Sequence, residues 1–131
     1  LLEAREIFEP GIVELACQRA TEEDIADIVA AFERWGAADE EDHTRPDQEF
    51  HLSIAKASHN VVLVNIMELH MDLLRRTLSK TLQNAGRRDE VYEEHRQIVE
   101  AIKRRDAEQA KAALLYHLRK VKENILVKQL A

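Results

Sequence analysis

The sequence predicts an all-α fold, an antiparallel bundle of about six helices. Its 131 residues include only three glycines and two prolines, too few turn residues for a fold dense in β-strands. Alanine, leucine, glutamate, lysine and arginine are abundant, and all five have high helix propensity. Apolar residues recur every three or four positions, the spacing of one helix face. The length suits a single domain, residues 1–131, with one hydrophobic core.

Six helices follow from this spacing and from residues that typically begin or end helices. They cover approximately residues 2–19, 21–36, 46–58, 61–81, 88–105 and 106–128. In the first, Pro10 should kink or restart the helix, because proline lacks a backbone N–H. The second begins at Thr21, where Thr21-x-x-Asp24 resembles a capping box. The acidic connector 37–45 is expected to be a solvated loop.

Similar signals set the remaining boundaries. Pro46 suits the first turn of the third helix, and Asn60 is a suitable cap for the fourth. Residues 83–87, which contain Gly86, make the next break. Asp106-x-x-Gln109 is a capping signature for the sixth helix. Short joints between helices favour antiparallel neighbours.

Charge and composition exclude several classes of function. The formal charge of −6 disfavours nucleic-acid binding by this chain alone, because affinity for phosphate comes mainly from clustered lysine and arginine. No apolar run approaches the ~20 residues that a membrane span needs. A single cysteine, Cys17, excludes an internal disulfide and fits a cytoplasmic location. Because the chain begins in helical pattern without methionine, we expect it to be part of a longer protein.

Three histidines occupy apolar helix stripes, where histidine is not expected. His51, His95 and His117 lie in three different predicted helices. A buried imidazole needs a partner, because an unpaired polar group in a core costs a few kcal/mol. A shared metal site would explain all three. The alternative is a set of unrelated core or surface histidines.

Helix arithmetic brings the three together with a carboxylate. Asp47 and His51 are four residues apart and therefore share one helix face. His95 lies ten residues before the turn at 105–106, and His117 lies eleven residues after it, so both lie ~15 Å from the turn. Imidazole nitrogens with a carboxylate oxygen suit zinc first, and also nickel, cobalt, iron or manganese. His70 could be a further metal neighbour or a pocket residue, and the sequence does not decide between them.

At these residues the sequence resembles a known family, over nearly the entire chain. The resemblance is to the C-terminal effector-binding (FCD) domain of the FadR subfamily of GntR transcription regulators. The matching motifs include Phe8-Glu9-Pro10, Asp47-x-x-Phe50-His51, Ala57-Ser58-x-Asn60, Glu94-His95-x-x-Ile98 and His117-Leu118.

The resemblance implies a ligand-sensing role rather than an enzyme. It implies a divalent metal held by Asp47, His51, His95 and His117, and a small carboxylic acid effector that completes the metal's coordination. It also implies DNA binding only through an N-terminal winged helix-turn-helix, which this chain lacks. A regulator that reads a palindromic site is expected to form a homodimer.

Three side chains are candidate effector-binding residues: Arg5, His70 and Arg75. Arg5 resembles a family position that meets the effector, and a guanidinium binds a carboxylate through two parallel hydrogen bonds. The alternative for Arg5 is a surface salt bridge with Glu9, four residues on. For Arg75, a solvated helix face is the stronger alternative.

Two other functions are compatible with the sequence. Three nitrogen ligands and an open coordination position also occur in catalytic zinc sites, so a metal-dependent hydrolase is one alternative. No nucleophile motif or H-E-x-x-H pattern supports it. A metal-free helical interaction module is the other. It predicts no metal in the purified protein and no effect of chelators on melting.

Overall fold

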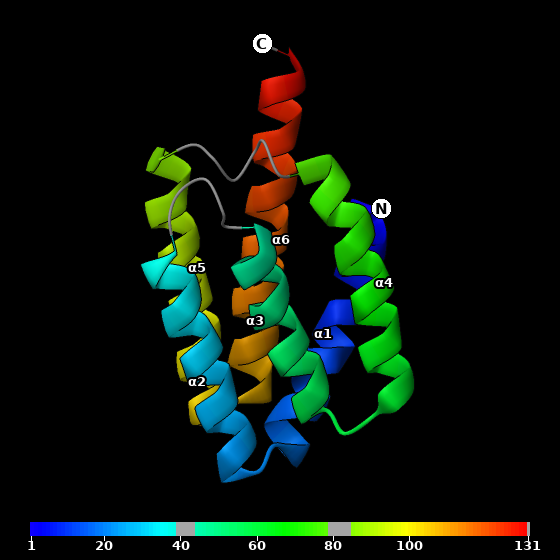
Figure 1. The fold of residues 1–131 in the computed structure, drawn as a ribbon, viewed down its shortest axis with the longest axis vertical. Helices are drawn as coiled ribbons and strands as arrows, with labels where there is room; N and C mark the ends of the chain where they lie inside the picture. Colours follow the sequence, from blue (N-terminus) through cyan, green and yellow to red (C-terminus); the bar gives the residue numbers. More distant parts are fainter. Residues whose placement is uncertain (39–43, 79–84, 131) are drawn as a thin grey trace.

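The computed structural model describes residues 1–38, 44–78 and 85–130, and within them the predicted all-α fold is confirmed (Figure 1). The described part of the chain contains six helices and no strand. The helices are α1 (Leu2–Arg19), α2 (Glu22–Ala37), α3 (Thr44–Ala57), α4 (Val61–Leu78), α5 (Ala85–Lys103) and α6 (Ala107–Leu130). No helix among these residues is long and apolar enough to cross a membrane.

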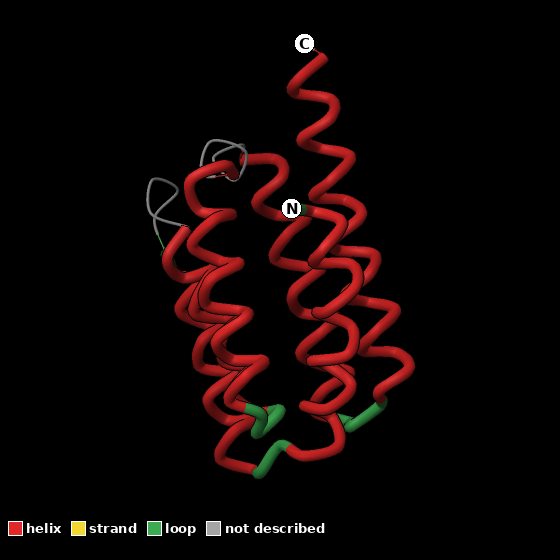
Figure 2. Tube along the Cα trace, turned by 90° about the vertical axis from the view of Figure 1, so that its right-hand side faces the viewer, coloured by secondary structure: helices red, strands yellow, loops and turns green. Residues whose placement is uncertain are grey.

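The helices run up and down along one long axis, so that neighbours in sequence are antiparallel (Figures 1 and 2). α1 and α5 pack extensively against α6, while α2 packs against α3 and α3 against α4. α6 is the longest helix, and its C-terminal end projects beyond the rest of the bundle (Figure 2). This arrangement places α3, α5 and α6, the helices that carry the three stripe histidines, around one interior.

The predicted caps begin three of the helices. The Thr21 hydroxyl accepts a hydrogen bond from the Asp24 backbone N–H, and the Asp24 carboxylate accepts one from the Thr21 N–H, which completes the capping box. The Asn60 side chain accepts from two backbone N–H groups in the first turn of α4. Asp106 accepts from the Gln109 N–H at the start of α6. These side chains satisfy donors that a helix N-terminus otherwise leaves unpaired.

Some boundaries differ from the sequence prediction. α1 continues through Pro10, so the predicted restart does not occur. α3 begins at Thr44, two residues before Pro46. α5 begins at Ala85, so part of the predicted break at 83–87 is helical. Gly86 is the second residue of this helix, where its low helix propensity matters least, and the buried ion pair between Arg87 and Glu94 anchors the same turn. Residues 39–43 of the acidic connector and the predicted end of the fourth helix near Thr81 lie outside the described residues.

The core combines one continuous apolar cluster with an unusual set of polar groups. Apolar side chains from all six helices form the cluster. Among them lie buried charged or titratable side chains: Arg5, Glu9, His51, His70, Arg87, Glu94, His95 and His117. Charged residues are almost never fully buried unless they are paired. The contacts of this polar set therefore define the candidate site.

Candidate metal centre

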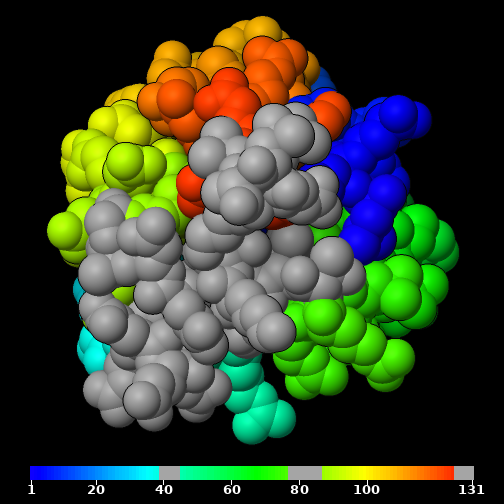
Figure 3. Space-filling view, turned by 90° about the horizontal axis from the view of Figure 1, so that it is seen from above, coloured from blue at the N-terminus to red at the C-terminus, as the bar shows by residue number. Residues whose placement is uncertain are grey.

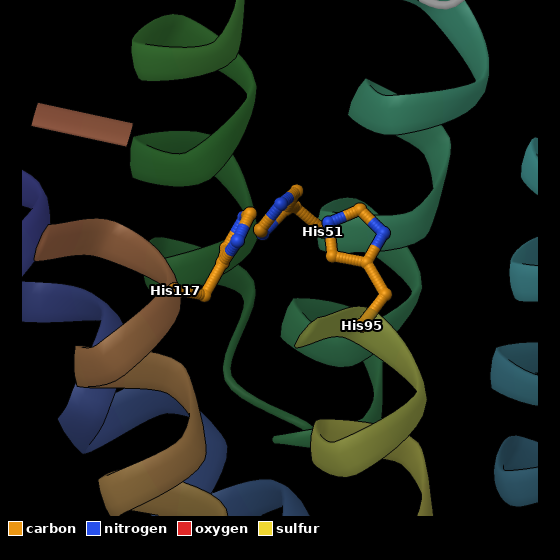
Figure 4. Close-up of side chains that lie close together, drawn as sticks. All are labelled: His51, His95 and His117. Carbon is orange, nitrogen blue, oxygen red and sulfur yellow. The ribbon is translucent and has the colours of Figure 1, made fainter. Parts of the chain in front are cut away.

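Three imidazoles converge in the middle of the bundle. His51 on α3, His95 on α5 and His117 on α6 point toward one another (Figure 4). One nitrogen from each lies within 4.8 Å of the nitrogens of the other two. All three residues are at most 2% exposed. The structure thus brings together the three histidines that the sequence analysis grouped.

A carboxylate lies beside two of these rings. Asp47 precedes His51 by one turn of α3, and its Oδ1 is 3.7 Å from His51 Nε2. The same oxygen is 3.5 Å from His95 Nε2. The four predicted metal ligands therefore gather at one place, with the carboxylate on the α3–α5 side of the cluster.

A buried ion pair on α1 supports His51. Glu9 Oε1 accepts a hydrogen bond from His51 Nδ1 at 3.0 Å, and Arg5 Nε donates to Glu9 Oε2 at 2.5 Å. Arg5 Nη2 lies 3.5 Å from His51 Nε2. The Arg5–Glu9 pair considered from the sequence does form, but in the interior rather than on the surface, since both residues are at most 3% exposed.

A second buried ion pair supports His117. Glu94 Oε1 accepts a hydrogen bond from His117 Nδ1 at 2.7 Å. Both terminal nitrogens of Arg87 donate to the Glu94 carboxylate, at 2.6 and 2.9 Å. Such a two-pronged contact fixes the carboxylate plane as well as its position.

His95 is held differently. Its ring stacks on Phe50, with centroids 4.4 Å apart, and meets the edge of Trp35 at 4.9 Å. Neither ring nitrogen makes a hydrogen bond to any described residue. Buried polar atoms in native proteins nearly always have a partner. His95 Nε2, 3.5 Å from Asp47 Oδ1, is therefore free of hydrogen bonds to the described residues and available to bind a ligand.

The surroundings set different charge states for the three rings. Burial lowers the pKa of His95 well below its usual value of 6.5, and burial also lowers the pKa of His117. Burial opposes a charge on His51 too, but Asp47 and Glu9 flank this ring and raise its pKa to about 9. These surroundings favour the neutral form of His95 and of His117 and the protonated form of His51.

The two flanking carboxylates stay ionised. Burial alone would raise the pKa of Glu9, but Arg5 and His51 together lower it to about 2. Burial would likewise raise the pKa of Asp47, which His51 and His95 hold well below its usual range. The cluster therefore presents two anionic carboxylates in the interior.

This donor set fits a divalent transition metal. Three imidazole nitrogens and one carboxylate oxygen suit zinc, nickel, cobalt, iron or manganese. Two of the imidazoles already have a hydrogen-bond acceptor on the nitrogen that faces away from the cluster, as metal-bound histidines almost always do. Four protein ligands also leave room for a further ligand on a five- or six-coordinate ion.

The other two candidate effector residues lie outside the cluster. His70 on α4 is 6% exposed and meets the edge of the Phe8 ring at 4.9 Å, but it is not among the clustered nitrogens. Arg75 has a 46% exposed side chain, 3.9 Å from Asp72 on the same helix. The structure thus places Arg75 on the solvated face that the sequence analysis considered as its alternative.

Sequence reasoning missed the groups that support the ligands. Glu9 and Glu94 lie on the same helix faces as the apolar residues Ile12 and Val91, at three-residue spacing. A charged residue inside an apolar stripe was the available signal. Arg87 is seven residues before Glu94, and thus on the same face, but the sequence analysis placed it in a break.

A comparison with protein families identifies the fold. The model of the FCD domain matches residues 1–120. The chain belongs to the FCD domain family. The resemblance noted in the sequence is therefore confirmed.

Curated relatives of this FCD domain are transcription regulators rather than enzymes. It is 35% identical over 130 residues to the HTH-type transcriptional regulator LutR of Bacillus subtilis, covering 94% of this chain and 59% of that protein. It is 34% identical to the Uxu operon transcriptional regulator of Escherichia coli, covering 96% and 52%. The putative L-lactate dehydrogenase operon regulatory protein of Escherichia coli is also 34% identical, with 90% and 47% covered. The chain thus spans about half the length of these relatives.

Solved structures agree on the fold. A GntR-family regulator from Pseudomonas syringae matches with a TM-score of 0.82 at 19% identity, over 98% of this chain and 55% of that chain. A Streptococcus agalactiae GntR protein matches with a TM-score of 0.72 at 26% identity, over 93% and 56%.

The burial of His70 predicts a loss of stability in weak acid. Burial and, after it, the charge of Arg5 lower the pKa of His70 from 6.5 to about 4. Between these values the unfolded chain binds more protons than the folded chain, so the free energy of unfolding decreases as pH falls from 6.5 to 4. We expect His70→Gln to show a shallower decrease than the unchanged domain, measured by urea unfolding in the presence of a chelator. Equal slopes for the unchanged domain and His70→Gln would contradict the prediction.

Proposed function

We propose that this FCD domain is the metal-dependent sensor of a small carboxylic acid in a bacterial transcription regulator. Effector binding would modulate DNA binding by a separate domain. The observation that carries the proposal is the gathering of His95 with two other imidazoles and Asp47: neither His95 nitrogen has a described hydrogen-bond partner, and its Nε2 lies 3.5 Å from Asp47 Oδ1. A ligand changes an equilibrium only through unequal affinity for two states, so the effector must bind one arrangement of the bundle more tightly.

The proposed metal ligands are Asp47, His51, His95 and His117. Zinc is the favoured ion, with nickel, iron or manganese as alternatives, because the set is rich in imidazole and lacks thiolate. When bound, the ion would supply a Lewis-acidic position that accepts an anionic oxygen. Binding requires His51 to lose the proton that it holds in the metal-free protein, because a protonated imidazole has no free lone pair.

Charge balance favours an anionic effector. The charges of Arg5 and Glu9 cancel, as do those of Arg87 and Glu94, which leaves Asp47 and the divalent ion with a net charge of about +1. A carboxylate oxygen would meet this charge at the ion, and Arg5, 3.5 Å from His51, is the nearest described guanidinium of the cluster.

Two further residues, His70 and Arg75, are candidates for contact with the effector. His70 is buried on α4, close enough to Arg5 for the charge of Arg5 to lower its pKa. We propose that His70 lines the effector site. A role for Arg75 stays a prediction, since it would require the side chain to turn inward. Two relatives are named for an L-lactate dehydrogenase operon and a galactonate operon, and lactate and galactonate are both hydroxy acids.

The expected cellular setting follows from the regulator relatives. We propose that the longer protein acts in the cytoplasm and contacts DNA through a part outside this chain, because the formal charge of −6 does not favour phosphate binding here. A regulator that reads a two-fold symmetric site works as a dimer.

One exposed apolar surface suits a second copy of this chain. Along α4, the side chains of Val62, Ile66, Leu69 and Leu73 are between 41% and 65% exposed, at 4-3-4 spacing. Ile7 of α1 is 73% exposed, and α1 lies beside α4 (Figure 3). A stripe with this spacing can pack against its own copy in antiparallel orientation about a two-fold axis. We propose it as the dimer interface.

Metal content tests the central claim. His95→Ala and His117→Ala should each reduce the zinc content of the purified domain and lower its melting temperature, because metal binding stabilises only the folded state. Elemental analysis and thermal melting with and without a chelator measure both effects.

His59→Ala is the matched control, because His59 is exposed and pairs with Asp24 away from the cluster. Its zinc content should equal that of the unchanged domain. Metal affinity should also weaken from pH 7.5 to 5.5 as the ligands compete with protons. A metal-free domain whose melting ignores chelators would support the interaction module instead.

A melting screen of small carboxylic acids tests the sensing role. Lactate-like and other short hydroxy acids should raise the melting temperature of the metal-loaded domain, and should do so less after metal removal or in Arg5→Met. Metal removal would take the ion away from the effector carboxylate, and Arg5→Met would take the guanidinium away from it. Equal shifts with and without metal would contradict coordination of the effector by the ion.

If the apolar stripe on α4 is the dimer interface, one charged substitution within it should dissociate the dimer into monomers. Leu69→Lys should convert a dimer of about twice 15.1 kDa into a monomer, because a lysine would be buried at the centre of the apolar stripe. Light scattering after size-exclusion chromatography measures the mass. Glu68→Lys, at the neighbouring exposed position, should remain dimeric. A Leu69→Lys dimer would place the interface elsewhere.

A further inference from the structure

Two of the three imidazoles belong to matching chains of buried groups. In one, Arg5 binds Glu9, which accepts from His51 Nδ1. In the other, Arg87 binds Glu94, which accepts from His117 Nδ1. The two chains come from unrelated stretches of sequence, and each ends on a different histidine of the cluster.

Glu94 accepts a hydrogen bond from Nδ1 of His117, the nitrogen that faces away from the cluster. A neutral imidazole carries one N–H and one lone pair. A carboxylate that accepts from Nδ1–H fixes the tautomer in which the lone pair is on Nε2, and it fixes the ring orientation. Only the nitrogen that faces His51 and His95 is then left to bind an ion.

Arg87 stabilises the buried carboxylate of Glu94. Glu94 is 7% exposed, and an isolated carboxylate there would take up a proton. A protonated carboxyl could donate to His117 Nδ1 and so favour the opposite tautomer. The two hydrogen bonds from Arg87 keep the carboxylate ionised and therefore an acceptor. Arg87 thus acts on His117 through Glu94.

His95 is oriented by aromatic contacts instead of by a carboxylate. Its ring is oriented by stacking on Phe50 and by the edge of Trp35, and no carboxylate of the described residues accepts a hydrogen bond from its nitrogens. Packing fixes the plane of the ring but leaves the tautomer free. The structure therefore orients two imidazoles by hydrogen bonding and one by aromatic contact.

We propose that Glu94, held by Arg87, is a positioning residue that commits His117 to the Nδ1–H tautomer and so prepares Nε2 for the metal. Glu9, held by Arg5, accepts from His51 Nδ1 in the same way, so that Nε2 is the nitrogen left to bind the ion once His51 has lost its second proton. This inference rests on the proposed metal site and goes beyond it, because it assigns a role to residues that are not ligands.

Glu94→Gln tests the inference, with Glu93→Gln as the matched control. Glu93 is the adjacent residue, but it is exposed and bonds to Arg96 and Gln97 rather than to a histidine. We expect Glu94→Gln to weaken zinc binding about 10- to 100-fold, the usual effect of losing such an acceptor, and Glu93→Gln to leave it unchanged. Competition with a chromophoric chelator measures the dissociation constant.

Side-chain nitrogen NMR of the metal-free domain gives a second readout, which a merely structural ion pair would not move. His117 should be in the Nδ1–H tautomer in the unchanged domain and in Glu93→Gln, and mixed in Glu94→Gln. If Glu94→Gln alone unfolds because Arg87 keeps only the exposed Glu90 as a partner, the double variant Arg87→Met with Glu94→Gln removes both buried charges and should show the same losses.

The outcomes separate the two claims. Zinc binding by the unchanged domain with equal affinity in Glu94→Gln, or in the folded double variant, overturns the positioning role and leaves the proposed function intact. An Nε2–H tautomer of His117 in the unchanged domain also overturns it. No zinc binding by the unchanged domain overturns the metal site and this inference together.

Discussion

The burial of imidazole and carboxylate groups inside an apolar bundle is the constraint on which the rest of the structure depends. Each of these groups is strongly hydrated when exposed, and each must recover that interaction within the fold. The bundle achieves this with pairs of opposite charge, Arg5 with Glu9 and Arg87 with Glu94. Among the described residues, both nitrogens of His95 and the Nε2 of His70 are left without a hydrogen-bond partner.

The helix order follows from this requirement. Because α1 supplies Arg5 and Glu9 to a histidine on α3, these two helices must pack together, as they do. Because α5 supplies Glu94 to a histidine on α6, the α5–α6 hairpin must keep its register. A slip by one residue in either pair would turn a charged group toward apolar side chains. The same contacts that prepare the site therefore specify how the helices align.

The sequence predicted the fold and the four proposed ligands because both depend on local periodicity. The spacing of Asp47 and His51 is a property of one helix, and the levels of His95 and His117 depend on one tight hairpin. The supporting pairs were not predicted because they depend on which distant face a helix meets. Helix spacing indicated that Arg5 and Glu9 are neighbours, but only tertiary packing shows that they are buried against α3. Arg87 was missed because a nearby glycine suggested a break, whereas α5 begins at Ala85 and the Arg87 side chain reaches Glu94 two turns along the same helix.

Trp35, whose ring contacts His95 in an edge-to-face arrangement, is the only tryptophan in the chain. Its indole, 4.9 Å from the imidazole by ring centroids and 2% exposed, is shielded from bulk solvent and experiences the charge at the cluster directly. All tryptophan emission from this domain therefore originates beside one proposed ligand. The fluorescence of Trp35 can therefore report on the cluster without an added fluorophore, which would not fit here without disturbing the core.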